Sequence, residues 1–297
     1  MKIGVTTFQD DPWEQVTAAA FVEALGARHQ VARLSGYPEG DQQFDLLFVI
    51  GVRPLWRFKL DEQRLRRHCR IICETGEYSL DRRATFADYY GYFLLNGLNL
   101  AENNFRIPRF VRDDLLYPDK NDDLLCIFVD HYLDRAPFLE LVVEQIERCP
   151  FPHEVLHQTF EGVVRDPDWG KILAEIARIG TGKAPYYKTL PFEEVAAGYR
   201  RAHVFMPTHV ETVGVVPTEI GACGALTLLP PRTVPDGVLN GVAHVLYDRD
   251  NPVDWPAVKA QTTPERQAQH RQGVLAAYGF DNFSRALLAF LETIPSG

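Results

Sequence analysis

The chain has 297 residues, of which 46% are hydrophobic and 11% aromatic, and its formal net charge is -9. This composition excludes a disordered chain, and the length is sufficient for two domains of ordinary size. The negative charge argues against a nucleic acid as partner, and no apolar run approaches the roughly 20 residues that span a bilayer.

The cysteines and the N-terminus indicate the compartment. The first residues lead directly into an expected strand and carry no signal peptide, and the five cysteines show neither a disulfide framework nor a paired metal spacing. An odd number of cysteines without such a framework is typical of a reducing cytoplasm. We therefore expect a cytoplasmic protein.

The first part of the chain alternates short apolar strands with amphipathic helices. Strands are expected at residues 2–7, 29–34, 44–51 and 70–73, and helices at residues 13–25 and 60–68. Such a βαβ series predicts a doubly wound parallel sheet in an α/β fold. Residues 81–112 fit either a strand or a helix.

A polar stretch follows at residues 113–123, with a proline and a run of Asp, Lys and Asn residues. This composition is typical of an interdomain linker, and a surface loop within one domain is the alternative. We expect an N-terminal domain at residues 1–118 and a C-terminal domain at residues 119–297.

The βα alternation resumes at residue 124 and predicts a second parallel sheet. Strands are expected at residues 124–129, 153–158, 225–229 and 244–247, an extended segment at 186–190, and helices at 137–148, 169–179, 192–202, 264–278 and 282–293.

The most informative segment lies at residues 207–214, which read Pro-Thr-His-Val-Glu-Thr-Val-Gly. A strand should end at Pro207 and a helix should begin near Val213. The amides at a helix N-terminus suit phosphate oxygens, and Gly214 lets the backbone approach a ligand closely. Glu211 and, eight positions later, Glu219 add carboxylates that accept hydrogen bonds from hydroxyl groups.

This segment resembles the donor site of retaining glycosyltransferases of the GT-B fold, specifically the Glu-x7-Glu motif of glycosyltransferase family 4. The matching residues are Pro207, Thr208, Glu211, Gly214, Glu219, Ala222 and Gly224. The resemblance implies two Rossmann-like doubly wound domains that face a central cleft, with the last helix packed back on the N-terminal domain. It covers most of residues 124–294, whereas the N-terminal half matches by pattern only. An ordinary αβ unit with two solvated glutamates is the alternative.

The resemblance also assigns roles to residues. Glu211 would hydrogen-bond the transferred sugar, and Glu219 would hold both ribose hydroxyls of the donor. His209 is a further catalytic candidate by its position alone, because it lies inside the turn and could reach the donor. The candidates for binding the phosphates and the donor sugar are the amides of Thr212, Val213, Gly214 and Val215.

The chain departs from the family where an arginine and a lysine usually grip the diphosphate. The corresponding residues 129–136 contain no lysine, so Arg135 is the best substitute and His131 the second. Arg135 could equally be a solvated or capping residue. Lys188 and Leu190 lie in the segment whose backbone reads the nucleobase in the family, or in a plain strand that leads into a helix.

The acceptor site is less defined. Asp10 and Asp11 could bind acceptor hydroxyls, although helix capping explains them too. Arginines at residues 53–70 form a basic stretch that would contact anionic lipid, unless it is a solvated face. Asp248 and Asp250 form an Asp-x-Asp sequence in an expected loop, and we assign no metal there.

We therefore expect a metal-independent hexosyltransferase without a cofactor, which uses a sugar linked to UDP or GDP. Retention is implied by the resemblance alone. The acceptor would be a glycan, a lipid-linked molecule or a small molecule, in glycoconjugate or polysaccharide biosynthesis. A non-catalytic sugar-nucleotide-binding subunit and a sugar-nucleotide epimerase are the alternatives. The oligomeric state stays open.

Overall fold

The computed structural model divides the chain into two compact units, residues 1–110 with 280–297 and residues 111–279. The described residues are 1–8, 12–40, 42–51, 60–66, 70–74, 88–92, 104–106, 110–121, 123–132, 137–160, 192–210, 215–231 and 239–294.

In its described part, the first unit contains a parallel sheet with the strand order β2-β1-β3-β4-β5-β6. The strands agree with the predicted series, and residues 81–112 contribute two more strands where the sequence left the choice open. The bounds are β1 Lys2–Thr7, β2 Gln30–Ser35, β3 Leu46–Ile50, β4 Arg70–Glu74, β5 Tyr89–Tyr92 and β6 Asn104–Arg106.

Helices cover both faces of this first sheet. On one face, α1 (Pro12–Gly26) and α10 (Phe280–Thr293) bury a core in which Phe21 packs against Phe283. On the other face, Leu65 of α3 (Glu62–Arg66) is buried against alternate residues of β3 and β4. The central strand β3 sends alternate side chains to these two buried faces, which explains its continuously apolar sequence Leu-Leu-Phe-Val-Ile.

The second unit contains a parallel sheet with the order β11-β10-β9-β7-β8 in its described residues. The chain passes from β7 to β8 on one side and then continues with β9 on the other side of β7, so the winding direction reverses between β7 and β9. The bounds are β7 Leu125–Tyr132, β8 His153–Phe160, β9 Val204–Pro207, β10 Leu226–Leu229 and β11 His244–Leu246.

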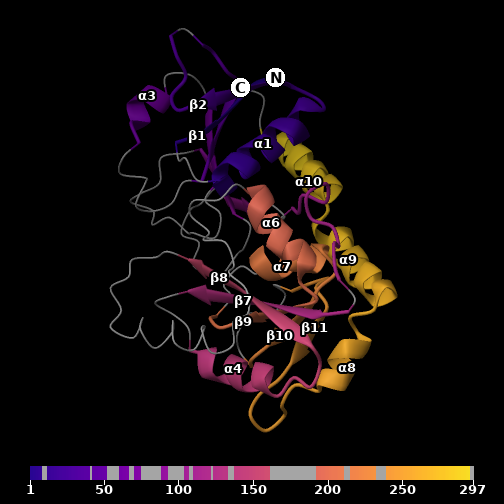
Figure 1. Cartoon of the computed structure of the whole chain (residues 1–297). Coiled ribbons are helices and arrows are strands. Elements are labelled where there is room, and N and C mark those ends of the chain that lie inside the picture. Colours follow the sequence, from indigo (N-terminus) through magenta and orange to yellow (C-terminus); the bar gives the residue numbers. More distant parts are fainter. Residues whose placement is uncertain are drawn as a thin grey trace. The chain divides into compact units, whose positions relative to one another are not determined.

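The helices of the second unit again lie on both faces (Figure 1). On one face, α4 (Leu139–Glu147) and α8 (Trp255–Ala260) form a core with alternate residues of β7, β9 and β10. On the other face, α6 (Phe192–Arg201) packs Tyr199 against Phe128, next to α7 (Val215–Ala222). Helix α9 (Pro264–Tyr278) packs against α7.

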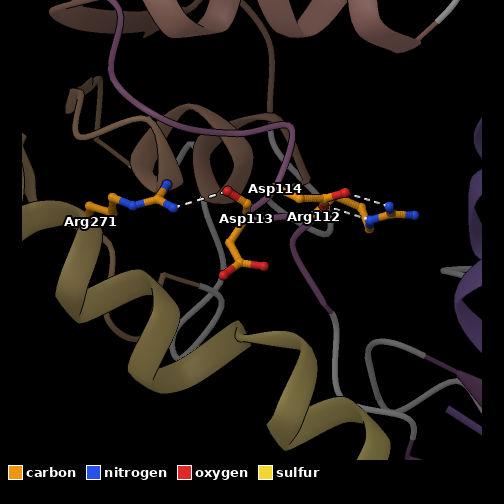
Figure 2. A network of polar contacts seen from close by, with 4 residues as sticks. All are labelled: Arg112, Asp113, Asp114 and Arg271. Carbon is orange, nitrogen blue, oxygen red and sulfur yellow. Dashed lines mark hydrogen bonds and ion pairs between the residues drawn. The ribbon is translucent and has the colours of Figure 1, made fainter. Parts of the chain in front are cut away.

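The polar segment after residue 110 belongs to the second unit rather than to a free linker, so the first unit ends at residue 110 and not at 118. The physical reason is a set of hydrogen bonds: Val111 N donates to Tyr278 O (2.9 Å), and Asp119 N donates to Arg200 O (3.0 Å). Arg112 also pairs with Asp114 within the segment (Figure 2). The chain returns to the first unit at Phe280 and continues into α10.

Most predicted elements are found within a few residues of their expected ends. The helix predicted at residues 169–179 and the extended segment at 186–190 lie outside the described residues. Helix α8 was not predicted, because its sequence Trp-Pro-Ala-Val-Lys-Ala is too short for a helical period. In the part of the chain that the structure describes, no helix is both long and apolar enough to cross a bilayer.

Candidate functional site

The candidate site lies at the carboxyl ends of β7 and β9, where the winding direction of the second sheet reverses. Asp130 near the end of β7 is paired with Pro207, the last residue of β9. In open parallel sheets, ligands bind outside the carboxyl ends of the strands at such a reversal. The predicted turn at residues 207–214 therefore leaves the sheet at the position where the fold favours a ligand.

Thr208 anchors the first part of this turn. Its backbone N and its Oγ1 both donate to the carbonyl oxygen of Asp130, at 3.1 Å and 2.9 Å. Its own carbonyl accepts from Phe138 N, just before α4, at 3.0 Å. The side chain is completely buried. Thr208 thus joins the end of β7, the end of β9 and the start of α4, which fixes where the turn leaves the sheet.

Two ionisable side chains are buried beside this anchor. Asp130 is fully buried and His209 is 5% exposed. Burying an ionisable group is costly unless its surroundings compensate for lost water, so such groups are often functional. His209 was expected as a site residue and Asp130 was not. The signal that could have identified Asp130 is a lone carboxylate at the end of the apolar run Leu-Cys-Ile-Phe-Val.

Glu219 lies in the second turn of α7, whose described residues from Val216 to Ala222 are all buried. Its exposed fraction is 6%, in a helix that otherwise reads Val-Val-Pro-Thr-Ile-Gly-Ala. The carboxylate is close enough to Cys223 to help burial raise the pKa of that thiol, which reaches about 12. A carboxylate in so apolar a helix is unusual for an ordinary αβ unit. Glu219 is therefore not solvated, as it would be in the alternative of an ordinary αβ unit with two solvated glutamates.

The remaining predicted residues are placed only in part. Val215 is the first residue of α7, as expected for a helix that begins after the turn. His131 lies in β7, paired with Thr159 of β8. The other candidates lie outside the described residues, so their roles stay predictions: Glu211, Thr212, Val213, Gly214, Arg135, Lys188, Leu190, Asp10 and Asp11.

A second group of polar residues, the buried His203 and the half-buried Lys120, lies at the opposite, amino-terminal edge of the sheet. His203 precedes β9, and its Nδ1 accepts from Cys126 N at 3.1 Å. Burial, assisted by the charge of Lys120, lowers the pKa of His203 to about 4. Lys120 donates to the carbonyl of Ala202, and burial lowers its pKa to about 8. This lysine is thus remote from the carboxyl edge and does not replace the one that residues 129–136 lack.

The Asp-x-Asp sequence at residues 248–250 forms a turn. Asp248 Oδ1 accepts from the backbone N of Asp250 (2.8 Å) and of Asn251 (2.6 Å). Arg249 lies near two glutamates of α4. Among the described residues, no group of three or more His, Cys, Asp or Glu side chains is placed to hold a metal ion.

Comparison with known proteins finds similarity in structure only. No family model matches the chain, and no curated protein is significantly similar in sequence. Sucrose-phosphate synthase from Thermosynechococcus elongatus has a TM-score of 0.65 at 14% identity, with 98% of both chains covered. HepE from Anabaena, solved in complex with UDP and glucose, has a TM-score of 0.63 at 11% identity, covering 99% of this chain and all of that one.

A third similar structure is the lipopolysaccharide outer core galactosyltransferase WaaB, with a TM-score of 0.55 at 12% identity, covering 98% of this chain and all of that one. Identities this low establish the fold and not the activity. The chain has the GT-B fold of glycosyltransferases over nearly its whole length, which confirms the fold that the motif implied.

Proposed function

We propose that this protein is a glycosyltransferase that moves a sugar from a nucleoside-diphosphate sugar to a hydroxyl acceptor. The observation that carries the proposal is the buried carboxylate of Glu219, in an otherwise apolar helix that follows the strand reversal of a GT-B fold. A carboxylate there can accept hydrogen bonds from the hydroxyl groups of a ligand. The HepE structures contain UDP-glucose or UDP with glucose, which makes UDP the first nucleotide to test.

In this proposal Glu219 accepts hydrogen bonds from both ribose hydroxyls, and Glu211 holds the transferred sugar. The amides at residues 212–215 stabilise the charge that develops on the departing diphosphate. Retention of the anomeric configuration would follow if the diphosphate itself takes the acceptor's proton on the face from which it leaves. The reaction would need no metal, so activity should survive EDTA. A glycan, a lipid-linked molecule or a small molecule is the acceptor class.

The test is calorimetric titration of the protein with UDP, GDP, ADP and their sugar conjugates. Glu219→Gln keeps the shape of the side chain and removes its charge. Because hydrogen bonds to charged groups contribute about 1.5–3 kcal/mol, we expect this variant to raise the Kd for the bound nucleotide about 10- to 100-fold. Glu193→Gln, at an exposed position of α6, is the matched control and should bind like the wild type.

The outcomes separate the possibilities cleanly. If the wild-type protein binds none of these nucleotides, the proposed function is wrong. If it binds one of them and Glu219→Gln binds equally well, the donor site is elsewhere. The anomeric configuration of any product, followed by NMR, tests retention.

One observation favours a second candidate, a subunit that binds a sugar nucleotide without turnover. Asp130 places a buried carboxylate in the stretch where the family carries cations for the diphosphate. A carboxylate there does not stabilise the negative charge that develops on a departing diphosphate, which disfavours turnover more than binding. Tight nucleotide binding with neither transfer nor hydrolysis would support this candidate.

A further inference from the structure

Helix α7, which carries Glu219, ends in a closely fitted hydrogen-bonded cap. Ala225 N donates to Ile220 O (3.2 Å) and Gly224 N donates to Gly221 O (2.8 Å), with Gly224 in the left-handed region at φ +78°. This is the pair of bonds that defines a Schellman motif. Among the last carbonyls of the helix, the one of Ala222 is then taken by a side chain from another helix, Arg271 of α9.

The guanidinium of Arg271 joins that helix end to a second part of the chain. Its Nη1 donates to the carbonyls of Ala222 and Leu116, and its Nη2 donates to the carbonyl of Asp113 at 3.1 Å. Figure 2 shows Arg271 directed at the backbone of Asp113, while the neighbouring Asp114 carboxylate faces Arg112 instead. Arg271 therefore donates to backbone carbonyls at the end of α7 and in residues 113–116. The ion pair with Asp114 is formed by Arg112.

The same face of α9 also limits how α7 can move. A Cβ on Gly221 would lie 2.9 Å from Val274 Cγ2, and one on Gly224 would lie 2.7 Å from Gln267 O. Gln267, Arg271 and Val274 are spaced by four and three residues, so they share one face of α9. The end of α7 is thus in backbone-level contact with this face, and Arg271 supplies its polar attachment.

We propose that Arg271 is a positioning residue for the nucleotide site, an inference that rests on the proposed role of Glu219. Glu219 lies three residues before Ala222, on the last turns of a helix that is only eight residues long. A shift or rotation at the attached end therefore displaces the carboxylate as well. Binding groups must be held to within roughly 0.5 Å, which makes affinity sensitive to the attachment.

The chemistry of arginine suits this task and that of lysine does not. A guanidinium presents a rigid fork of donors that can reach several carbonyls at once, whereas an ammonium is a single point. Arg271→Lys should keep the positive charge near the helix end but lose part of the bridge to Asp113 and Leu116. Arg271→Met keeps the length of the side chain and removes every hydrogen bond.

The experiment measures the Kd for UDP at 20 °C by calorimetry, with GDP and ADP in parallel, together with Tm for each variant. We expect Arg271→Met to raise Kd at least tenfold and Arg271→Lys to raise it by a smaller factor. Arg266→Met, on the same helix, loses a side-chain bond to Gln269 and should bind like the wild type. If turnover is measurable, KM for the donor should rise while KM for the acceptor does not.

A purely structural role is recognisable in this design. If Arg271→Met lowers Tm but leaves Kd unchanged, Arg271 does not position the site and the inference is wrong. If Arg271→Met does not fold, Arg271→Lys decides, and a wild-type Kd in that variant overturns the inference. Failure of the wild-type protein itself to bind any of the nucleotides would instead overturn the proposed function on which the inference rests.

Discussion

At the scale of single residues, the sequence identified ionisable side chains of the candidate site but not the hydrogen bonds that fix the turn in place. Glu219 and His209 stand out because carboxylates and imidazoles are recognisable by type and spacing. Thr208 matters through hydrogen bonds to Asp130 and Phe138, which are far from it in sequence. Such contacts depend on the strand order, and a single sequence does not encode that order in any local pattern. Asp130 was overlooked for the same reason.

His203 should make the protein sensitive to mild acid. Its pKa is about 4 in the folded protein, because burial disfavours the charged ring, and about 6.5 in the unfolded chain. Between these values the unfolded chain binds a proton that the folded protein does not, so stability falls as the pH decreases from 6.5 towards 4. We expect the titration of His203 to lower the free energy of unfolding by about 2 kcal/mol as the pH falls from 7.5 to 5.

Urea unfolding of His203→Asn at these two pH values checks this expectation. The Asn Oδ1 can accept from Cys126 N as the histidine Nδ1 does, but it does not titrate, so the pH dependence should shrink by the same amount. Equal pH dependence in His203→Asn and the wild type would contradict the assignment.

At the scale of elements, the hydrophobic pattern predicted most strands and helices because each packs against neighbours on a periodic face. The exceptions have physical causes. The segment after Phe110 is polar, like a linker, yet its backbone is tied to Tyr278 and Arg200. Polar composition reports solvent exposure and not the partners of backbone groups. Glycines give the opposite case: Gly224 matches the motif, but the role of Gly221 and Gly224 in the contact between α7 and α9 is visible only in three dimensions.

Gly224→Ala should therefore be destabilising for two separate reasons. The residue has φ +78°, which costs an L side chain about 1 kcal/mol, and the added Cβ would lie 2.7 Å from the carbonyl oxygen of Gln267. Together we expect a loss of about 2–4 kcal/mol in the free energy of unfolding. Urea unfolding measures this loss.

The matched control is Gly26→Ala at the end of α1, where an added Cβ meets nothing within 4 Å. This change should be neutral or stabilising by up to about 1 kcal/mol. If Gly224→Ala is as stable as Gly26→Ala, α7 and α9 do not approach each other as closely as the structure shows.

At the scale of the whole molecule, the chain enters the second unit at Val111 and leaves it at Gly279, and these two residues pair side by side. Helix α10 is last in sequence but belongs to the core of the first unit, where Phe283 contacts Phe21 and Phe110. Hydrophobic periodicity predicts such a helix without indicating which core it joins. Only the resemblance to the GT-B fold indicates that this helix packs on the N-terminal domain.

Because the two units have separate cores, a destabilising substitution in α10 should lower the stability of the first unit alone. Phe283 is fully buried, so Phe283→Ala should cost the first unit about 3–5 kcal/mol. Hydrogen exchange followed by mass spectrometry should show faster exchange in β1 and β3, with β7 and β9 unchanged. Glu292→Ala, on the same helix, removes an exposed ion pair with Arg28 and should cost less than about 1 kcal/mol. Equal loss of protection in β7 and β9 would mean that the two units unfold together, because local damage spreads only through a shared cooperative core.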